Sequence, residues 1–248
     1  MGLVKWFILA IQFSTIFPTP VVHHATESDI RKSVVFFPIV GVLLGGILWG
    51  VQIVLTRHMP NLAATAVSLT IYTISTGALH LDGLMDTADA IGSRRPRADA
   101  LHIMKDSRIG AMGAIAAVLV LVGKLSAISS LAPEHFAPFI VVPMLSRLGM
   151  VWSMQLYPSA RSEGLGWLFA RRIPAFVVAV ATIASALVCI LSLSAWSCLW
   201  VLIYFVTCVS LFNWWMFHRF GGTTGDTYGA VNEILEWLGW LVLAGINQ

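Results

Sequence analysis

The chain has 248 residues, of which 58 % are hydrophobic and 11 % are charged, with a mean hydropathy of +0.83 and a net charge of +3. A soluble domain normally carries about 25 % charged residues, so this composition excludes a protein whose whole surface faces water. The few charges also leave no basic surface for nucleic acid, so we expect a lipid bilayer and no nucleic acid among the partners.

The N-terminus predicts a retained amphipathic or partly inserted helix rather than a cleaved signal peptide. The apolar run in MGLVKWFILAIQFSTIFPTP is short, and no small-x-small cleavage pattern follows it. Pro18 and Pro20 should end this helix, because proline interrupts helical hydrogen bonding. The polar segment 21–32 then leads to the first clear span.

Six to seven membrane-spanning helices of about 20 residues each are expected after this segment. Polar loops and prolines separate the apolar stretches and set their ends. The predicted spans cover residues 33–56, 61–84, 109–131, 136–157, 175–193, 196–217 and 228–246. The predicted fold class is therefore all-α, a polytopic membrane helix bundle, with residues 1–248 forming a single integral-membrane domain.

Lysines and arginines concentrate on one side of this topology. If the segment 21–32 is cytoplasmic, the loops 87–108, 157–173 and 218–227 lie on the same side. Together with Lys5, these four regions hold twelve of the fifteen basic residues. Such an excess is typical of cytoplasmic loops, so this end of the bundle is predicted to face the cytoplasm.

Five of the twelve acidic residues lie between positions 80 and 110. Asp82, Asp86 and Asp89 are spaced four and three residues apart, so on a helix they stack within about 60° of one another. Carboxylates crowded near lipid need a neutralising cation, and their hard oxygens suit Mg²⁺. The spacing favours a magnesium site over a solvated helix end. His80 is a candidate base, but it lies about 160° around the helix from Asp82 and should point away.

A second acid lies where the span 109–131 begins. Asp106 shares a helix face with Gly110 and Gly113, whose small size would let this helix pack closely and bring Asp106 to the magnesium site. Lys105 and Arg108 flank it and are candidates for binding phosphate oxygens. An interfacial loop with ordinary cytoplasmic charges also explains these two cations adequately.

Several charged residues lie deep in predicted spans. Arg147 is about nine residues, or roughly 14 Å, from the cytoplasmic end of its span, and Glu233 and Glu236 lie one and two turns into the last helix. Charges at such depth face the bundle interior and pair. Arg147 should therefore pair with Glu233 or Glu236, or bind substrate phosphate. Lys124 either snorkels outward or faces the interior.

The glycine-rich loop GGTTGDTYGA precedes the last helix. Amides at the start of a helix can bind phosphate, and Thr224 and Asp226 add a hydroxyl and an acid. Ordinary turns have a similar composition, so this signal is weak alone. The candidate substrate-binding residues are Lys105, Arg108, Arg147, Thr224, Asp226 and Glu233. Together, these groups indicate displacement at the phosphorus of a magnesium-bound diphosphate with a nucleotide leaving.

The same residues resemble a known family over nearly the whole chain. HLDGLMDTADAIGS, IMKDSRIG, GGTTGDTYGA and the early FPIVGVLLGG are similar to the motifs of cobalamin synthase, adenosylcobinamide-GDP ribazoletransferase. The resemblance implies that the 3′-hydroxyl of α-ribazole, or of its 5′-phosphate, attacks the cobinamide-linked phosphorus of adenosylcobinamide-GDP. GMP then leaves, and adenosylcobalamin or its 5′-phosphate forms.

The resemblance also implies Mg²⁺ as cofactor, the bacterial inner membrane as location and a catalytic site that faces the cytoplasm. Carried onto this sequence, the metal site falls on Asp82, Asp86 and Asp89, with Asp106 completing it. Asp82, Asp86 and Asp106 are the candidate catalytic acids. One of the acids, or a bound water, is expected to remove the hydroxyl proton.

Three other functions remain as alternatives. CDP-alcohol phosphotransferases share the reaction type, but their first aspartate position is Leu79 here, and their Ala-Arg pair is Asp86-Thr87. A prenyltransferase would normally show two aspartate-rich motifs in related halves. A cation transporter should place its acids near the bilayer midplane, whereas these acids crowd one rim. The glycine faces, such as that of Gly41 and Gly45, would permit a homodimer.

Overall fold

The computed structural model describes residues 2–170 and 173–246, so Arg171 and Arg172, counted above among the cytoplasmic cations, lie outside the described residues. Within the described residues the regular elements are helices, apart from one isolated β-bridge between Ser159 and Thr223. The helices are α1 (Gly2–Ser14), α2 (Glu27–Ser33), the 3₁₀ turn η1 (Val34–Phe36), α3 (Phe37–Leu55), α4 (Asn61–Ser75), α5 (Leu79–Gly92), α6 (Arg97–Ile103), α7 (Ala111–Ser129), α8 (Ala137–Leu156), α9 (Leu165–Ala170), α10 (Ala175–Ser192), α11 (Ala195–Phe220) and α12 (Gly225–Ile246).

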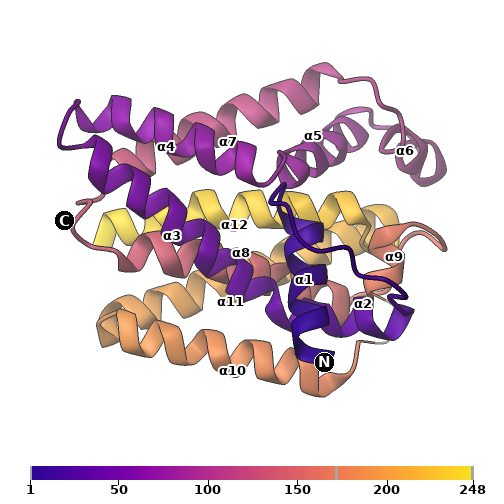
Figure 1. Cartoon of the computed structure of the whole chain (residues 1–248). Helices are drawn as coiled ribbons and strands as arrows, with labels where there is room; N and C mark the ends of the chain where they lie inside the picture. Colours follow the sequence, from indigo (N-terminus) through magenta and orange to yellow (C-terminus); the bar gives the residue numbers. More distant parts are fainter. Residues whose placement is uncertain (1, 171–172, 247–248) are drawn as a thin grey trace.

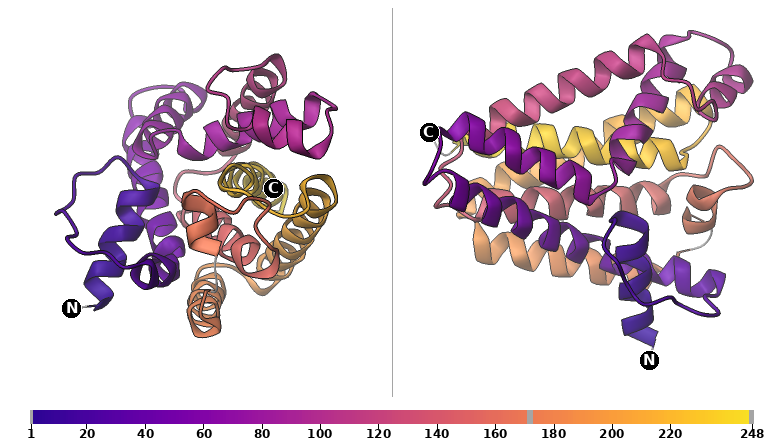
Figure 2. Two further views of the ribbon diagram at one scale, coloured as in Figure 1. Left: turned by 90° about the vertical axis from the view of Figure 1, so that its right-hand side faces the viewer. Right: turned by 45° about the horizontal axis from the view of Figure 1, so that its top comes forward.

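The long helices form a bundle with α8 and α12 at its centre (Figures 1 and 2). Six spans are long and apolar enough to cross a membrane, and α4 with α5 would make a seventh. The apolar windows of α8 and α12 are 78 % and 61 % buried, but those of α7, α10 and α11 only 22–33 %. The outer helices expose aliphatic side chains such as Leu119 and Ile183. A surface of this kind suits lipid, which confirms the predicted polytopic membrane bundle.

The short helices gather at one end of the bundle, on the right in Figure 1. Helix α1 crosses the direction of the long helices there and is too short to span a bilayer. Its Lys5 and Trp6 donate hydrogen bonds of 2.7 and 2.9 Å to the carboxylate of Asp29 in α2. Leu3 and Val4 on its outer side are exposed. The polar bonds hold α1 against α2, while its apolar side chains remain available to lipid, as expected for an interfacial helix.

Helices α3 and α8 approach each other closely because α3 carries glycine at the contact. A Cβ atom on Gly41 would overlap the carbonyl oxygen of Pro143, and one on Gly45 would overlap that of Phe139. The glycine face predicted from the sequence therefore packs within the chain. Such small-residue contacts let helix backbones pack where no hydrophobic driving force exists between helices in lipid.

Gly45→Ala is expected to destabilise the protein by about 1–3 kcal/mol, because the added methyl group must push α3 away from α8. The measurement is thermal or denaturant unfolding of the purified protein in detergent. Gly50→Ala in the same helix is the matched control, since nothing lies within 4 Å of a Cβ placed there. Equal stability of the two variants would contradict this account of the α3–α8 contact.

The predicted continuous span 61–84 is wrong. Helix α4 ends at Ser75, α5 begins at Leu79, and the two helices are bent by 87° at this break. Gly77 and Ala78 have φ values of 60° and 55°, and two successive left-handed residues cannot continue a right-handed helix. The bend places the aspartate-rich sequence on a separate helix at the end of the bundle where the short helices gather.

Candidate active site

A cavity of about 250 Å³ opens at this end of the bundle. Its walls come from α1, α5, α8, α9, α12 and the loop between α8 and α9. The lining residues are Phe13, Leu79, His80, Asp82, Gly83, Met150, Ser159, Arg161, Glu163, Gly164, Gly166, Trp167, Thr224, Gly225 and Asp226. Three of the residues predicted from the sequence, Asp82, Thr224 and Asp226, therefore meet in one cavity although more than 140 positions separate Asp82 from the other two.

Close packing of α5 on α12 creates this meeting point. A Cβ atom on Gly83 would lie 2.7 Å from the carbonyl oxygen of Asp226, and one on Gly229 would lie 2.8 Å from that of His80. Both distances are too short for real side chains, so the two glycines are required for this contact. The first turns of α5 and α12 thereby bring their acids to the same cavity.

The three stacked aspartates have two different environments. Asp82 is exposed in the cavity, and Asp86 and Asp226 lie within electrostatic range of it. Asp89 instead accepts hydrogen bonds of 2.8 Å from the backbone amides of Gly110 and Gly113, at the start of α7. A carboxylate at this position stabilises the N-terminus of a helix. The helical spacing is as predicted, but both oxygens of Asp89 are already engaged, and its ligand role stays a prediction.

Asp106 lies apart from these acids and pairs with Arg108. The Arg108 guanidinium donates to both carboxylate oxygens, and its charge and hydrogen bonds lower the pKa of Asp106 to about 2. Gly110 and Gly113 do allow close packing, as predicted, but the side chain that they approach is Asp89. Asp106 is absent from the residues that line the cavity. Its predicted part in the metal site is therefore not supported by this geometry and stays a prediction.

Arg161 and Glu163 are charged residues of the cavity that the sequence did not single out. The Nη1 atom of Arg161 lies 2.9 Å from Oδ2 of Asp226, and among the described residues that line the cavity Arg161 is the one lysine or arginine. The loop that carries it is fixed to the glycine-rich loop, because Ala160 donates to the carbonyl of Thr223 and Thr223 donates to that of Pro158, at 2.8 and 2.9 Å. Sequence spacing gives no signal for this pair, since 65 positions separate Arg161 from Asp226.

Thr224 fixes the start of α12. Its hydroxyl accepts a hydrogen bond of 3.2 Å from the amide of Thr227, and its own amide donates one of 2.8 Å to the hydroxyl of Thr227. This reciprocal arrangement resembles a capping box and uses Thr224 for local structure. Gly225 and Asp226 follow on the cavity wall. The predicted phosphate-binding end of the helix thus lies at the cavity, with part of its donor set already satisfied.

His80 is among the residues that line the cavity, but the charges that act on its ring are those of Arg147, Glu236 and Lys124 in the bundle interior, in agreement with the expectation that it points away from the stacked aspartates. His80 is 2 % exposed, and its Nε2 has no hydrogen-bond partner among the described residues. Its ring is therefore buried in the bundle, and a role as a base stays a prediction.

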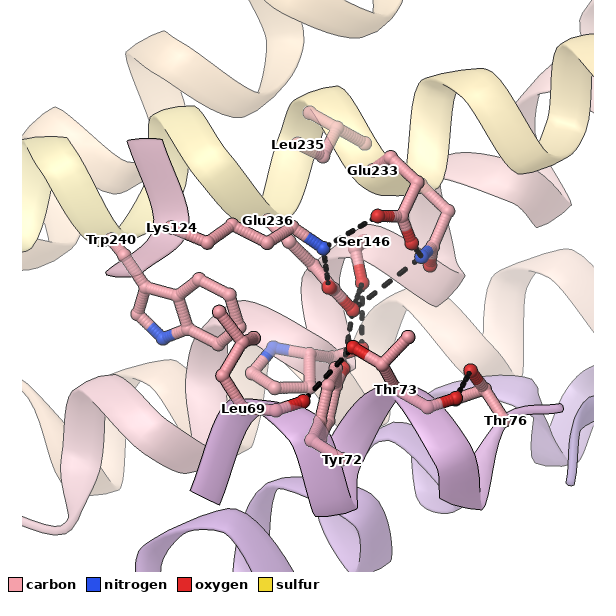
Figure 3. Close-up of polar contacts among 12 residues, drawn as sticks. Leu69, Tyr72, Thr73, Thr76, Lys124, Ser146, Glu233, Leu235, Glu236 and Trp240 are labelled. Carbon is pink, nitrogen blue, oxygen red and sulfur yellow. Dashed lines mark hydrogen bonds and ion pairs between the residues drawn. The ribbon is translucent and has the colours of Figure 1, made fainter. Parts of the chain in front are cut away.

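A buried network of charges lies deeper in the bundle (Figure 3). Nζ of Lys124 donates to Glu233 at 2.8 Å and to Glu236, and Nη1 of Arg147 donates to Glu236 and, at 2.8 Å, to the hydroxyl of Tyr72. The predicted pairing of Arg147 with a glutamate is confirmed. Lys124 is 2 % exposed, so it faces the interior and does not snorkel. Arg147 and Glu233 do not line the cavity, and their predicted contact with substrate stays a prediction.

The cavity offers oxygen donors of the kind that Mg²⁺ prefers, but no complete cage. Among the described residues, no three His, Cys, Asp or Glu side chains are arranged to hold a metal ion on their own. Mg²⁺ is usually held by one or two carboxylates and completed by water and substrate phosphates. Asp82 and Asp86, with Asp226 nearby, therefore fit an ion that arrives with a phosphate substrate.

Known proteins of one family match this chain over its length. The family described as cobalamin-5-phosphate synthase matches residues 6–244. The chain belongs to this family. It is 34 % identical to the adenosylcobinamide-GDP ribazoletransferase of Geotalea daltonii, with 99 % of each chain covered. The protein with the same name from Desulforamulus reducens is 39 % identical, and the match covers 96 % of this chain and 95 % of the relative. The one from Pseudomonas syringae is 35 % identical, and the match covers 96 % of this chain and 98 % of the relative.

Membership in the family makes the chain an enzyme of cobalamin biosynthesis and confirms the resemblance seen in the motifs. It decides against the CDP-alcohol phosphotransferase, prenyltransferase and transporter alternatives. No solved structure is similar to the chain.

Proposed function

We propose that this enzyme joins adenosylcobinamide-GDP to α-ribazole, or to its 5′-phosphate, and releases GMP. The observation that carries this proposal is a cavity at one end of a membrane bundle that contains carboxylates from α5 and α12 beside a guanidinium. Such a set suits a diphosphate bound with a divalent cation. The names of the relatives supply the substrates.

The proposed reaction is one displacement at phosphorus. The 3′-hydroxyl oxygen of the ribazole forms a bond to the cobinamide-linked phosphorus, and the bond from that phosphorus to the bridging oxygen breaks. The bridging oxygen keeps the electron pair and leaves as part of GMP. A carboxylate of the cavity, Asp82 or Asp226, accepts the hydroxyl proton and passes it to water.

The residues of the chain bind and orient the diphosphate. Asp82 and Asp86, with Asp226, would hold Mg²⁺, which when bound neutralises phosphate charge in the ground state and on the leaving group. Arg161 is positioned to donate to phosphate oxygens, because its guanidinium lies at the cavity wall next to Asp226. Arginine suits this task, since it presents several donors in a fixed geometry.

We further propose that the bundle lies in the bacterial inner membrane with this cavity facing the cytoplasm. The excess of lysine and arginine at the same end supports this orientation. Nucleotide substrates are water-soluble and charged, so a cavity at the rim of the bundle can receive them without their crossing the apolar core.

The reaction is tested with purified protein in liposomes, given adenosylcobinamide-GDP, α-ribazole and Mg²⁺. We expect equal amounts of GMP and of a corrinoid product that contains the ribazole base. Chelation of divalent cations should stop GMP release, and added Mg²⁺ should restore it. Absence of GMP under every lipid condition would rule out the proposed reaction, and unchanged rates after chelation would rule out the role of the metal.

A further inference from the structure

A second cavity, of about 290 Å³, lies next to the first at the same end of the bundle. It is formed by α6, the residues that follow it and the loop after α8. The lining residues are Ala98, Leu101, His102, Lys105, Ala160, Arg161, Ser162 and Glu163. Arg161 and Glu163 also line the first cavity, so these two side chains form a shared wall.

Both residues of the shared wall, Arg161 and Glu163, make polar contacts with neighbouring elements. Arg161 reaches Asp226 of the first cavity with Nη1, and its Nη2 lies 3.4 Å from the carbonyl oxygen of Leu101 in the second. Its Nε is buried and has no partner among the described residues. Nζ of Lys105 lies 2.8 Å from Oε1 of Glu163, and this pairing lowers the pKa of Glu163. A guanidinium with an unused donor thus stands between two cavities.

The two cavities differ in the sign of their charge. The first is lined by three carboxylates, Asp82, Glu163 and Asp226, against the single guanidinium of Arg161. The second is lined by Lys105 and Arg161 against the single carboxylate of Glu163, with the ring of His102 beside them. An anion without a metal ion is therefore repelled by the first cavity and attracted by the second.

The chemistry of the proposed function produces such an anion. Cleavage of the diphosphate leaves a nucleoside monophosphate whose phosphate gains a terminal oxygen and negative charge. We propose that the second cavity binds this leaving nucleoside monophosphate, with Lys105 and Arg161 at its phosphate and His102 beside the nucleoside. This inference rests on the proposed function, and it adds a separate binding site for one product. The volume is close to the lower limit of about 300 Å³ for small-molecule pockets.

Binding of GMP to the purified protein in detergent, without Mg²⁺ and without the second substrate, tests the proposal. Lys105→Ala should weaken GMP binding by about tenfold, the effect of one charge-assisted hydrogen bond. Glu163→Gln should strengthen it several-fold, because the carboxylate that competes for Lys105 is removed. If the ion pair had only a structural role, both variants would weaken binding or neither would change it.

Arg94→Ala is the matched control, since Arg94 is an exposed cation in the 87–108 connector that does not line the cavity. Its GMP affinity should equal that of the natural protein. Guanosine should bind at least tenfold more weakly than GMP, and inorganic phosphate should compete only at much higher concentration. Equal losses in Lys105→Ala and Arg94→Ala, equal affinity for inorganic phosphate and GMP, or no GMP binding at all would each overturn the proposal.

The outcome separates this site from the reaction itself. GMP binding that depends on Lys105, in a protein that never releases GMP from adenosylcobinamide-GDP, would retain the site and reject the reaction. GMP release during turnover, with binding that is indifferent to Lys105 and Glu163, would retain the reaction and reject the site.

Discussion

Asp82→Asn is expected to lower the turnover rate by roughly 10³-fold, in line with the loss of a single strong electrostatic contact at a reacting centre. Asp82 lies exposed in the cavity on the first turn of α5, beside Asp86 and Asp226. The asparagine side chain has nearly the same shape as the aspartate carboxylate but carries no charge. It therefore binds a divalent cation poorly and cannot accept the hydroxyl proton. GMP release from adenosylcobinamide-GDP, followed over a range of Mg²⁺ concentrations, measures the effect.

The fold should survive this change, because Asp82 is exposed and packs in no core position. The unfolding temperature and the helical content of Asp82→Asn should therefore match those of the natural protein. Asp99→Asn is the matched control, since Asp99 is an exposed acid in α6 outside the cavity. Full activity of Asp82→Asn, or an equal loss in Asp99→Asn, would remove Asp82 from the proposed metal and catalytic site.

Most of the fold follows from the sequence because apolar length decides membrane spans. Helices α3, α7, α8, α10, α11 and α12 all fall within a few residues of their predicted ranges. The break between α4 and α5 was missed, since an apolar run does not reveal backbone dihedral angles. Gly77 after Thr76 is the local signal that could have marked the end of a helix.

The acids of the site could be predicted in part. The spacing of Asp82 and Asp86 puts them on one face of α5; Asp82 lines the cavity, and Asp86 lies within electrostatic range of it. Periodicity could not show that Asp89 caps α7, because that contact depends on where the amides of Gly110 and Gly113 lie. Periodicity also could not show that the guanidinium of Arg161, in the loop between α8 and α9, lies beside Asp226. Tertiary contacts of this kind leave no pattern in a single sequence.

For the buried charged residues, depth within a predicted membrane span indicates the direction of the side chain better than the local sequence pattern does. Arg147, Glu233 and Glu236 were predicted to face the interior because an unpaired charge in lipid is costly, and the structure confirms this. Lys124 was ambiguous because a lysine near a span end can reach water. Its two glutamate partners, more than 100 positions away, decide its direction.

This buried network gives the second large expected effect. Glu236→Gln should destabilise the protein by about 3–5 kcal/mol, as when one partner of a buried ion pair is removed. Glu236 is fully buried and meets Lys124, Arg147 and Tyr72. With a neutral glutamine at this position, the two cations Lys124 and Arg147 face one remaining carboxylate, that of Glu233. Unfolding in detergent, followed by helical content, measures the change, and Glu27→Gln at the surface should alter stability by no more than about 0.5 kcal/mol.

A second variant shows whether charge or packing causes this loss. Lys124→Met combined with Glu236→Gln leaves Arg147 with Glu233 and restores equal numbers of buried positive and negative charges. The double variant should be more stable than the sum of the two single changes predicts, by about 0.5–3 kcal/mol. Strict additivity would mean that the residues act through packing alone. Because α12 carries both Glu236 and Asp226, a charge-coupled network would also fix the helix on which the cavity depends.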